Sequence, residues 1–355
     1  MKTVLITGGA GFIGLSLARA FADDGAAVHV LDNFSRGKDD AALAAFRAQP
    51  NNEFIRLDLA AEGATDTLAA DYDAIFHFAA ILGVANVTDR PYETLTLNVA
   101  LTRETLRLAR RQKNLRACVF ASTSEVYAGS LSAGLLQFPT PEDSIIALAP
   151  LTSARTSYML SKLYGEAMVC QAGVPYIIIR PHNVYGPRMG TEHVVPELMK
   201  RMHTSKPGAD MRIHSPRHTR TFCYIDDAVE LIKRLIKSDA AVGKVWNVGT
   251  EAPEYPILEV AEIVRRTLGA DVNLIPGDET AGSASSIRKS AETRPQLAQR
   301  NNPGKRLDWY APPHTMQRVR SSGFASAGGA VDCGRFMRPI RWIFLACWRL
   351  RSDVG

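Results

Sequence analysis

A tyrosine and a lysine lie four residues apart in the string YMLSK, as Tyr158 and Lys162 of this 355-residue chain. At this spacing two side chains share one face of a helix. A phenol with its usual pKa of about 10 is a poor base at neutral pH, but a neighbouring positive charge lowers the pKa and favours the phenolate. The pair therefore predicts a base that removes the proton of a substrate hydroxyl.

Hydroxyl side chains and a carboxylate follow the apolar run ACVFA, in the string STSEVY. The apolar run predicts a buried strand, whose carboxyl end delivers Ser122, Thr123, Ser124 and Glu125 to one edge of a sheet. A hydroxyl there can hold the substrate oxygen while Tyr158 takes its proton and hydride leaves the same carbon. The Y-x-x-x-K spacing alone is common on amphipathic helices, so the chemistry depends on the combination.

Glycines Gly8, Gly11 and Gly14 stand in the string TGGAGFIG, between the first expected strand and the first expected helix. They permit a tight turn and let a pyrophosphate approach the helix N-terminus. Asp32 ends the second expected strand eighteen residues later, where a carboxylate accepts hydrogen bonds from an adenosine ribose and repels a 2′-phosphate. The pattern predicts NAD rather than NADP, although Arg36 favours NADP; a turn or cap aspartate is the structural alternative.

Continuous apolar runs alternate with amphipathic runs of helical spacing up to residue 182. The expected strands are 3–9, 27–32, 52–59, 72–80, 115–124 and 176–181, and the expected helices are 12–25, 98–111 and 156–173. Such an alternation is typical of a parallel sheet covered on both faces. We therefore expect an α/β fold, a Rossmann-type doubly wound parallel sheet with a smaller C-terminal substrate-binding lobe.

Three segments are predicted along the chain. Residues 1–182 form an NAD-binding Rossmann domain with the catalytic residues. Residues 183–317 are mainly a substrate-binding lobe, from which one or two elements return to the main sheet. Residues 318–355 form an atypical basic tail, rich in Arg, Gly and Ser, which is expected to be non-native or disordered; a membrane- or partner-binding tail is the alternative.

The net charge of +6 comes from the end of the chain. Residues 281–355 hold 13 Lys/Arg against 4 Asp/Glu, while the first 280 residues hold 29 against 32. A slightly acidic body argues against nucleic-acid binding. No leader pattern, no apolar run long enough to span a membrane, no metal-ligand spacing and five scattered cysteines are seen. These features predict a cytoplasmic protein with reduced thiols, no metal and no membrane partner.

Together these strings resemble the extended short-chain dehydrogenase/reductase family, in particular its nucleotide-sugar epimerases, dehydratases and decarboxylases. The resemblance spans roughly residues 1–317 and depends on TGGAGFIG, Asp32, HFAA, Asn98, STSEVY, YMLSK, RPHNVYGPR, RTFCYIDDAVE and VWNVGT. It implies a bound NAD that takes hydride from a UDP-linked nucleotide sugar and returns it in each cycle. It also implies a homodimer built on the helices around Asn98 and Tyr158.

The resemblance further implies roles for individual residues. Thr123, Tyr158 and Lys162 form the catalytic set, and Ser124 and Glu125 are the variable positions that select the sugar chemistry. The predicted cofactor contacts are Gly8, Gly11, Phe12, Ile13, Gly14, Asp32, Asn33, Asp58, Leu59, Ala79, Ala80, Asn98, Tyr158, Lys162 and Pro181. The predicted substrate contacts are Asn183, Arg188, Arg220 and Arg288, since planar guanidinium groups suit a diphosphate. His77, inside the fourth expected strand, is interpreted as structural.

The residues at positions 124 and 125 leave the reaction open. Dehydratases of the family have an Asp–Glu pair where this chain has Ser124 and Glu125. STSEVYA is close to the STSEVYG of UDP-glucuronate decarboxylases, but YMLSK differs from their Y-D-E-G-K string. We therefore expect a UDP-sugar 4-epimerase, with a UDP-glucuronate decarboxylase as the alternative. Further alternatives are a 4,6-dehydratase, an NADPH-dependent small-molecule reductase and a non-catalytic NAD-binding regulator.

Overall fold

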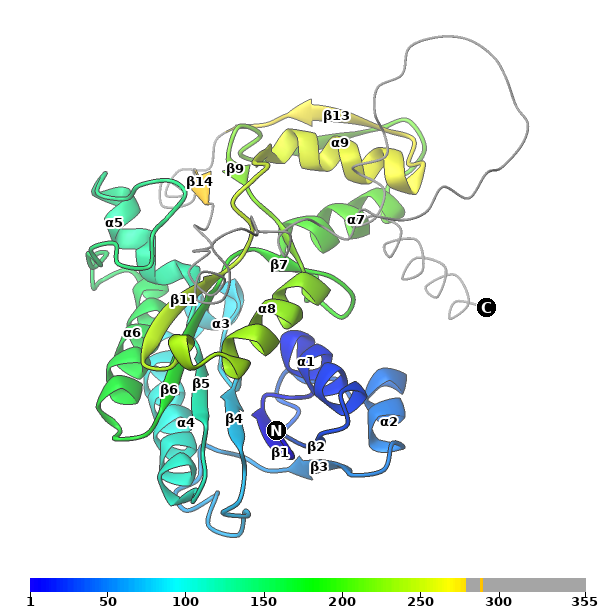
Figure 1. Ribbon diagram of the computed structural model, residues 1–355. Coiled ribbons are helices and arrows are strands. Elements are labelled where there is room, and N and C mark those ends of the chain that lie inside the picture. The colour runs from blue at the N-terminus through cyan, green and yellow to red at the C-terminus, as the bar shows by residue number, and fades with distance from the viewer. Residues whose placement is uncertain (279–287, 290–355) are drawn as a thin grey trace, which may run out of the picture. The chain divides into compact units, whose positions relative to one another are not determined.

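The central feature of the fold is a seven-stranded parallel sheet (Figure 1). The computed structural model describes residues 1–278 and 288–289, and all that follows concerns those residues. The strands run in the order β11-β6-β5-β4-β1-β2-β3, with β1 at Thr3–Thr7, β2 at Ala27–Asp32, β3 at Asn52–Arg56, β4 at Ala74–His77, β5 at Ala117–Ala121, β6 at Tyr176–Pro181 and β11 at Lys244–Val248. The predicted Rossmann-type parallel sheet is confirmed.

Helices cover both faces of this sheet in two pairs. Helix α1 (Phe12–Asp23) packs against α8 (Ile225–Lys237), and α4 (Pro91–Arg111) packs against α6 (Ala154–Gln171). In β6, Ile178 belongs to the same core cluster as Leu101 and Leu108 of α4. Ile177 and Ile179 point to the opposite face and are equally buried. A strand buried on both faces explains the continuous apolar run in the sequence.

The strand order reverses between β1 and β4. From this point the chain builds outward to β3 on one side and to β6 on the other. Open α/β sheets bind ligands beyond the carboxyl ends of their strands, at this switch point. Asp32 and Pro181 are the last residues of β2 and β6, and Gly8, Ala79 and Ser122 follow the ends of β1, β4 and β5. The predicted cofactor-binding and catalytic residues therefore share one edge of the sheet.

Several helices differ from the predicted ranges. Helix α4 begins at Pro91, seven residues before the predicted start, because proline is well suited to the first position of a helix. Asp40 caps α2 by accepting hydrogen bonds of 3.1 Å from the N–H groups of Ala42 and Leu43. Five short helices of the described residues were not predicted, namely α2 (Ala41–Arg47), α3 (Val84–Asp89), α5 (Ala128–Ser132) and the 3-10 helices η1 (Ser124–Tyr127) and η2 (Asp239–Ala241).

The residues after β6 form a second core with smaller sheets. Helices α7 (Val194–Thr204) and α9 (Ile257–Leu268) share an apolar cluster with the parallel pair β8 (Ala209–Ile213) and β13 (Val272–Pro276). The other short elements are β7 (Val184–Tyr185), β9 (Thr219–Arg220), β10 (Cys223–Tyr224), η2 (Asp239–Ala241), β12 (Tyr255–Pro256) and β14 (Arg288–Lys289). Strand β11 returns to the main sheet beside β6, as expected.

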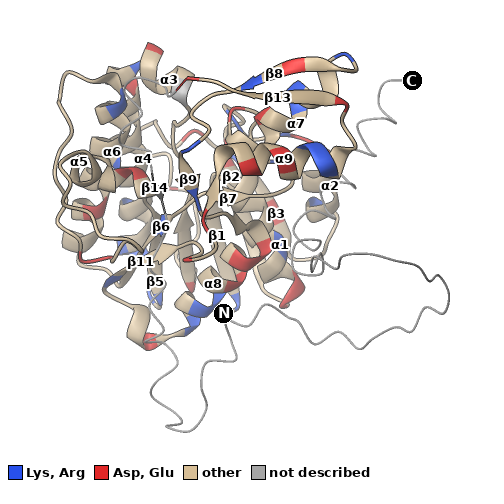
Figure 2. Cartoon of the chain, turned by 90° about the horizontal axis from the view of Figure 1, so that it is seen from above, with Lys and Arg blue, Asp and Glu red and all other residues tan. Residues whose placement is uncertain are grey.

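The described residues all belong to one compact unit. The predicted boundary between residues 182 and 183 therefore stays a prediction, and the tail at 318–355 lies outside the described residues. Charged side chains of both signs are mixed over the described elements (Figure 2). Among these residues no group of three or more potential metal ligands occurs. Within the same ranges, no helix is long and apolar enough to cross a membrane.

Candidate active site

Three predicted catalytic residues meet beyond the carboxyl end of β5. Tyr158 and Lys162 lie one turn apart on α6, which packs against β5. Thr123 is the N-cap of η1, directly after β5. Its hydroxyl lies near the phenol of Tyr158, where it acts to lower the pKa of that phenol, and it accepts a 3.2 Å bond from the N–H of Glu125. The arrangement places a hydroxyl and a phenol side by side, as removal of a proton from a bound alcohol requires.

The ammonium group of Lys162 is buried and turned toward the sheet. Its Nζ donates a 2.8 Å hydrogen bond to the carbonyl of Ala121 and lies 5.9 Å from the centre of the Tyr158 ring. Burial lowers the pKa of Lys162 to about 8, although the carboxylate of Glu166 acts in the opposite direction. The ammonium is close enough to interact electrostatically with Tyr158, but burial in the folded chain disfavours the charged form of Lys162.

The phenol of Tyr158 has a raised pKa in this environment. Burial raises the pKa to about 12 and the charge of Glu125 adds to the rise, while the Thr123 hydroxyl and the Arg36 charge oppose it. The phenolate was expected to be favoured by Lys162 together with a positively charged cofactor ring, and the protein groups alone do not lower the pKa of Tyr158, because desolvation outweighs the nearby cations. Formation of the phenolate near neutral pH therefore requires a further positive charge at the site.

The burial of Lys162 gives a pH-dependent prediction for stability. Its pKa is about 8 in the folded chain and 10.5 as a free side chain, so the penalty for its charge is fully present below pH 8 and disappears between pH 8 and 10.5. We expect wild type to gain stability relative to Lys162→Met over this range. Urea unfolding of both proteins at pH 7, 8, 9 and 10 measures the difference, and a constant difference would contradict the buried cation.

A buried polar cluster behind Lys162 links α6 to β5 and β6. Glu166 accepts a 2.5 Å hydrogen bond from the hydroxyl of Ser122 and two bonds, of 2.9 and 2.7 Å, from the guanidinium of Arg180. Arg180 also donates to the hydroxyl of Tyr127 at 2.6 Å. The sequence interpretation missed this cluster. Its signal was Arg180 itself, a charge inside an apolar strand, which needs a buried partner.

The glycine-rich loop fits the pyrophosphate of a dinucleotide. Gly8 has φ +67°, and a Cβ there would lie 2.6 Å from the backbone nitrogen of Ala79, so a side chain is excluded. Helix α1 starts after its N-cap Gly11 with no side-chain cap and no acidic residue in its first turn. The N–H groups of this turn, which include those of Phe12 and Ile13, are therefore available to an anion.

Asp32 lies at the end of β2 with its side chain almost buried. Its carboxylate accepts hydrogen bonds from the N–H of Ala10 at 3.1 Å and of Phe34 at 2.8 Å. Each carboxylate oxygen can accept a further bond, so the same group can hold the loop and a ribose diol. Arg36, which favoured NADP in the sequence, donates to the carbonyl of Leu82 at 2.7 Å.

The remaining predicted cofactor residues follow the strands along the same edge. Asn98 on α4 holds the segment after β4, because its amide accepts from the N–H of Ile81 at 2.7 Å and donates to the carbonyl of Ile81 at 2.9 Å. It also donates to the hydroxyl of Ser161 on α6 at 3.1 Å. The others are Gly14 in α1, Asn33 after β2, Asp58 and Leu59 after β3, Ala79 and Ala80 after β4, and Pro181 at the end of β6.

His77 in β4 is buried among hydroxyl groups. Its Nδ1 lies 2.8 Å from the hydroxyl oxygen of Thr7 and 3.0 Å from that of Thr105. Burial lowers the pKa of His77 to about 3, so the ring is neutral at physiological pH. These contacts agree with the structural role expected for this residue.

Two predicted substrate residues, Asn183 and Arg188, lie in the segment after β6. Asn183 has φ +43°, and its buried amide nitrogen has no hydrogen-bond partner among the residues that the structure describes, so it can bind a ligand. Arg188 instead contacts the cofactor end of the site. Its guanidinium donates to the carbonyl of Ala10 at 2.6 Å and forms an ion pair with Asp40.

The other two predicted substrate residues lie on neighbouring strands. Burial lowers the pKa of Arg220 in β9 to about 10, and the charge of Glu125 acts in the opposite direction. Arg288 in β14 is the parallel pairing partner of Thr219, the residue before Arg220. The pairing thus places positions 220 and 288 on neighbouring strands, with Lys289 rather than Arg288 directly opposite Arg220.

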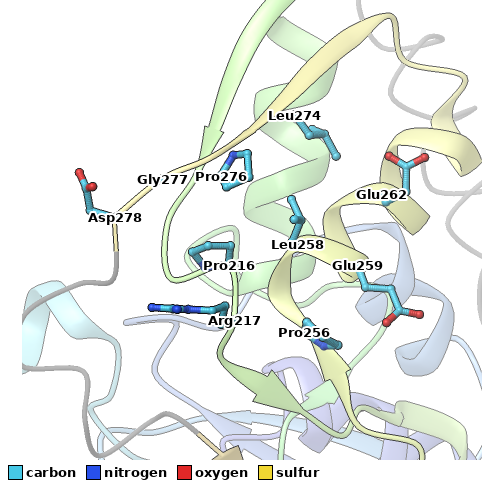
Figure 3. Close-up of a pocket in the computed structure, with 10 residues that line it drawn as sticks. All are labelled: Pro216, Arg217, Pro256, Leu258, Glu259, Glu262, Leu274, Pro276, Gly277 and Asp278. Carbon is cyan, nitrogen blue, oxygen red and sulfur yellow. The ribbon is translucent and has the colours of Figure 1, made fainter.

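A separate pocket of about 1040 Å³ lies between the loop after β8, strand β13 and the start of α9 (Figure 3). Its lining combines proline and leucine side chains with Glu259 and Glu262, and the carboxylate of Glu262 is already hydrogen-bonded to Arg265. None of the predicted site residues lines this pocket. The residues that carry the chemistry are those at the carboxyl edge of the main sheet.

Comparison with known proteins gives matches over most of the chain. The NAD dependent epimerase/dehydratase family matches residues 4–249. The UDP-N-acetyl-alpha-D-glucosaminuronate decarboxylase of Bacillus cytotoxicus is 32% identical over 270 residues, which cover 75% of this chain and 80% of the relative. UDP-glucuronic acid decarboxylase 6 of Arabidopsis thaliana is 31% identical over 279 residues, which cover 76% of each chain.

A solved structure adds a third similar protein. The UDP-glucuronic acid 4-epimerase of Bacillus cereus, in complex with UDP-glucuronic acid and NAD, has a TM-score of 0.69 and 25% identity. The match covers 82% of this chain and 90% of the epimerase. All three proteins are named for a UDP-linked uronic acid, although two are decarboxylases and one is an epimerase.

Proposed function

The chain belongs to the NAD dependent epimerase/dehydratase family, and from that premise we propose that it is a UDP-sugar 4-epimerase. NAD dependence, which the sequence predicted, is a property of this family. One observation carries the proposal, the proximity of the Thr123 hydroxyl to the phenol of Tyr158, with Lys162 one turn further along α6. These residues and the glycine-rich loop supply what 4-epimerisation needs, and no further acid is required.

The protein groups at this site move and hold one proton. NAD, when bound, supplies the hydride acceptor and an additional positive charge. Tyr158 removes the proton of the sugar 4-hydroxyl, and the hydroxyl of Thr123 holds the same oxygen. Lys162 favours the phenolate through its charge. After the sugar has turned its other face toward the cofactor, return of hydride to C4 and of the proton from Tyr158 to the same oxygen would complete inversion at C4.

The substrate-binding residues predicted for the nucleotide end of the substrate form a group apart from the catalytic residues. Arg220 and Arg288 lie on paired strands, and two guanidinium groups match a diphosphate better than ammonium groups do. The unpaired amide nitrogen of Asn183 adds a hydrogen-bond donor near the end of β6. We assign these three residues to the UDP-sugar.

Decarboxylation of UDP-glucuronate is the second candidate, and the two decarboxylases among the relatives favour it. Oxidation of a uronic acid at C4 places a ketone β to the C5 carboxylate, and β-keto acids lose CO2 readily. Epimerisation and decarboxylation of a UDP-uronate therefore share their first step. The charge of Glu125 acts on both Tyr158 and Arg220, so we assign Glu125 to the part of the sugar that differs between the two reactions.

A product assay separates the two candidates. Purified protein is incubated with UDP-glucose, UDP-N-acetylglucosamine and UDP-glucuronate labelled with 13C in its carboxyl group. We expect the 4-epimer of one of these sugars without labelled CO2. Labelled CO2 as the main product from UDP-glucuronate would replace the first candidate with the second. Failure to convert any of the three, with NAD present in the protein, would contradict both.

A homodimer and a cytoplasmic location belong to the same proposal. Helices α4 and α6 pack together and expose large side chains, Tyr92 at 74% and Tyr164 at 58%, which a second copy would cover. Cys118 and Cys223 are buried and form no disulfide within the part of the chain that the structure describes. Unpaired thiols fit a reducing compartment.

A further inference from the structure

Ala10 in the glycine-rich loop is held through both of its backbone groups. Its N–H donates to the carboxylate of Asp32 at 3.1 Å. Its carbonyl accepts a 2.6 Å hydrogen bond from the guanidinium of Arg188 and a 3.3 Å bond from the N–H of Lys38. The other end of the Ala10–Gly11 peptide is also held, because the N–H of Gly11 donates to the carbonyl of Gly8 at 3.1 Å. The orientation of this peptide therefore depends on a side chain that comes from the segment after β7.

Arg188 reaches this position from a strained backbone. Its φ is +70°, a left-handed conformation that residues other than glycine rarely adopt, so contacts of the side chain must hold it. The side chain is only 14% exposed and forms an ion pair with Asp40, the N-cap of α2. Arg188 thus connects the start of α1, the start of α2 and the segment after β7.

We propose that Arg188 is a positioning residue for NAD, which fixes the Ala10–Gly11 peptide and thereby orients the N–H groups at the start of α1. Gly11 is the N-cap of α1, so a rotation of this peptide would turn the first-turn N–H groups away from a bound pyrophosphate. The guanidinium also places a positive charge beside the helix N-terminus, which favours an anion there. The inference uses the NAD dependence of the proposed function, but it is independent of the sugar reaction.

The inference differs from the substrate role that the sequence predicted for Arg188. A substrate contact and a cofactor-positioning contact predict different losses when the side chain is shortened. Loss of a substrate contact weakens the binding of UDP, whereas loss of a cofactor-positioning contact speeds the release of NAD. Both quantities can be measured on the NAD-loaded protein without turnover.

The test compares NAD release from wild type, Arg188→Met and Arg188→Lys. Each NAD-loaded protein is transferred to NAD-free buffer, and the nucleotide that remains is released by acid and quantified over time. A hydrogen bond from a charged group supports a change of about 10- to 100-fold, so we expect Arg188→Met to lose NAD faster by that factor. Arg188→Lys should recover part of the retention, because an ammonium keeps the charge but lacks the fork that reaches both Ala10 and Asp40.

Two further variants separate positioning from a general loosening of the fold. Asp40→Asn keeps a good cap for α2 but removes the ion pair, and it should speed NAD release less than Arg188→Met. Arg212→Met removes an exposed arginine paired with Asp278, with side chains 63% and 96% exposed, and should release NAD at the wild-type rate.

Four results would overturn the inference. The first two are NAD release at the wild-type rate in Arg188→Met and equal acceleration of NAD release in Arg188→Met and Arg212→Met. The third is weaker UDP binding in Arg188→Met, measured by calorimetry, at an unchanged rate of NAD release. The fourth is failure of the wild-type protein to bind NAD. Failure to convert any UDP-sugar, with the change in NAD release intact, would contradict only the proposed function.

Discussion

Replacing Tyr158 with phenylalanine is expected to lower turnover of the UDP-sugar by about 10²- to 10⁴-fold, the usual contribution of a positioned acid–base group. The variant keeps the ring on α6 but removes the hydroxyl that lies near Thr123, so no group remains to take the substrate proton. The steady-state rate on the sugar identified by the product assay measures the effect. The NAD released by acid should match that of wild type, because the glycine-rich loop is unchanged.

Tyr164→Phe is the matched control for this prediction. Tyr164 lies on the same helix, but it is 58% exposed, and removal of its hydroxyl should leave turnover and NAD content unchanged. Near-normal turnover in Tyr158→Phe would reject Tyr158 as the base. Loss of both turnover and NAD would contradict the assignment in another way, since the hydroxyl would then be needed to hold the cofactor.

Replacing Glu166 with alanine is expected to lower the free energy of unfolding by about 3–5 kcal/mol, because it leaves the charge of Arg180 buried without a partner. The side chains of Glu166 and Arg180 are 10% and 6% exposed. Arg180 binds both carboxylate oxygens, and the hydroxyl of Ser122 donates to one of them. Equilibrium urea unfolding of the variant and wild type measures this loss.

The chain offers a control with the same chemistry at the surface. Glu262 also receives two hydrogen bonds from one arginine, Arg265, at 2.9 and 2.7 Å, but both side chains are 35% exposed. Exposed ion pairs contribute little to stability, so Glu262→Ala should unfold close to the wild-type urea midpoint. Glu166→Gln, which keeps the shape of the side chain, should fall between the two. Equal midpoints for Glu166→Ala and Glu262→Ala would contradict the importance of the buried pair.

The sheet could be predicted from the sequence because its strands are buried on both faces. Strands β2 and β6 have the predicted bounds, 27–32 and 176–181. The pairing of β8 with β13, and the short strands around β9, could not be predicted, since an apolar run identifies a strand but not its neighbour. The start of α4 at Pro91 was missed for a different reason, because the first turns of that helix are polar and lack an apolar period.

The site was predictable where spacing alone determines geometry. Tyr158 and Lys162 share a helix face because they are four residues apart, and Thr123 is placed by the end of β5. The direction of Arg188 could not be predicted, since it depends on a left-handed backbone conformation that the sequence pattern does not reveal. The raised pKa of Tyr158 was also inaccessible, because it results mainly from burial.

The position of β11 at the edge of the sheet has a consequence for biosynthesis. When residue 181 has left the ribosome, strands β1 to β6 are present, but β6 keeps an open edge until residues 244–248 follow. The nascent chain thus displays a strand with one unpaired edge, which contains Ile177, Ile178 and Ile179, all buried in the complete fold, and such an edge can pair with other chains. Chaperone protection during translation should therefore matter most after residue 181 has emerged and before residues 244–248 follow. A chain that stops within this interval would be a substrate for quality-control proteases.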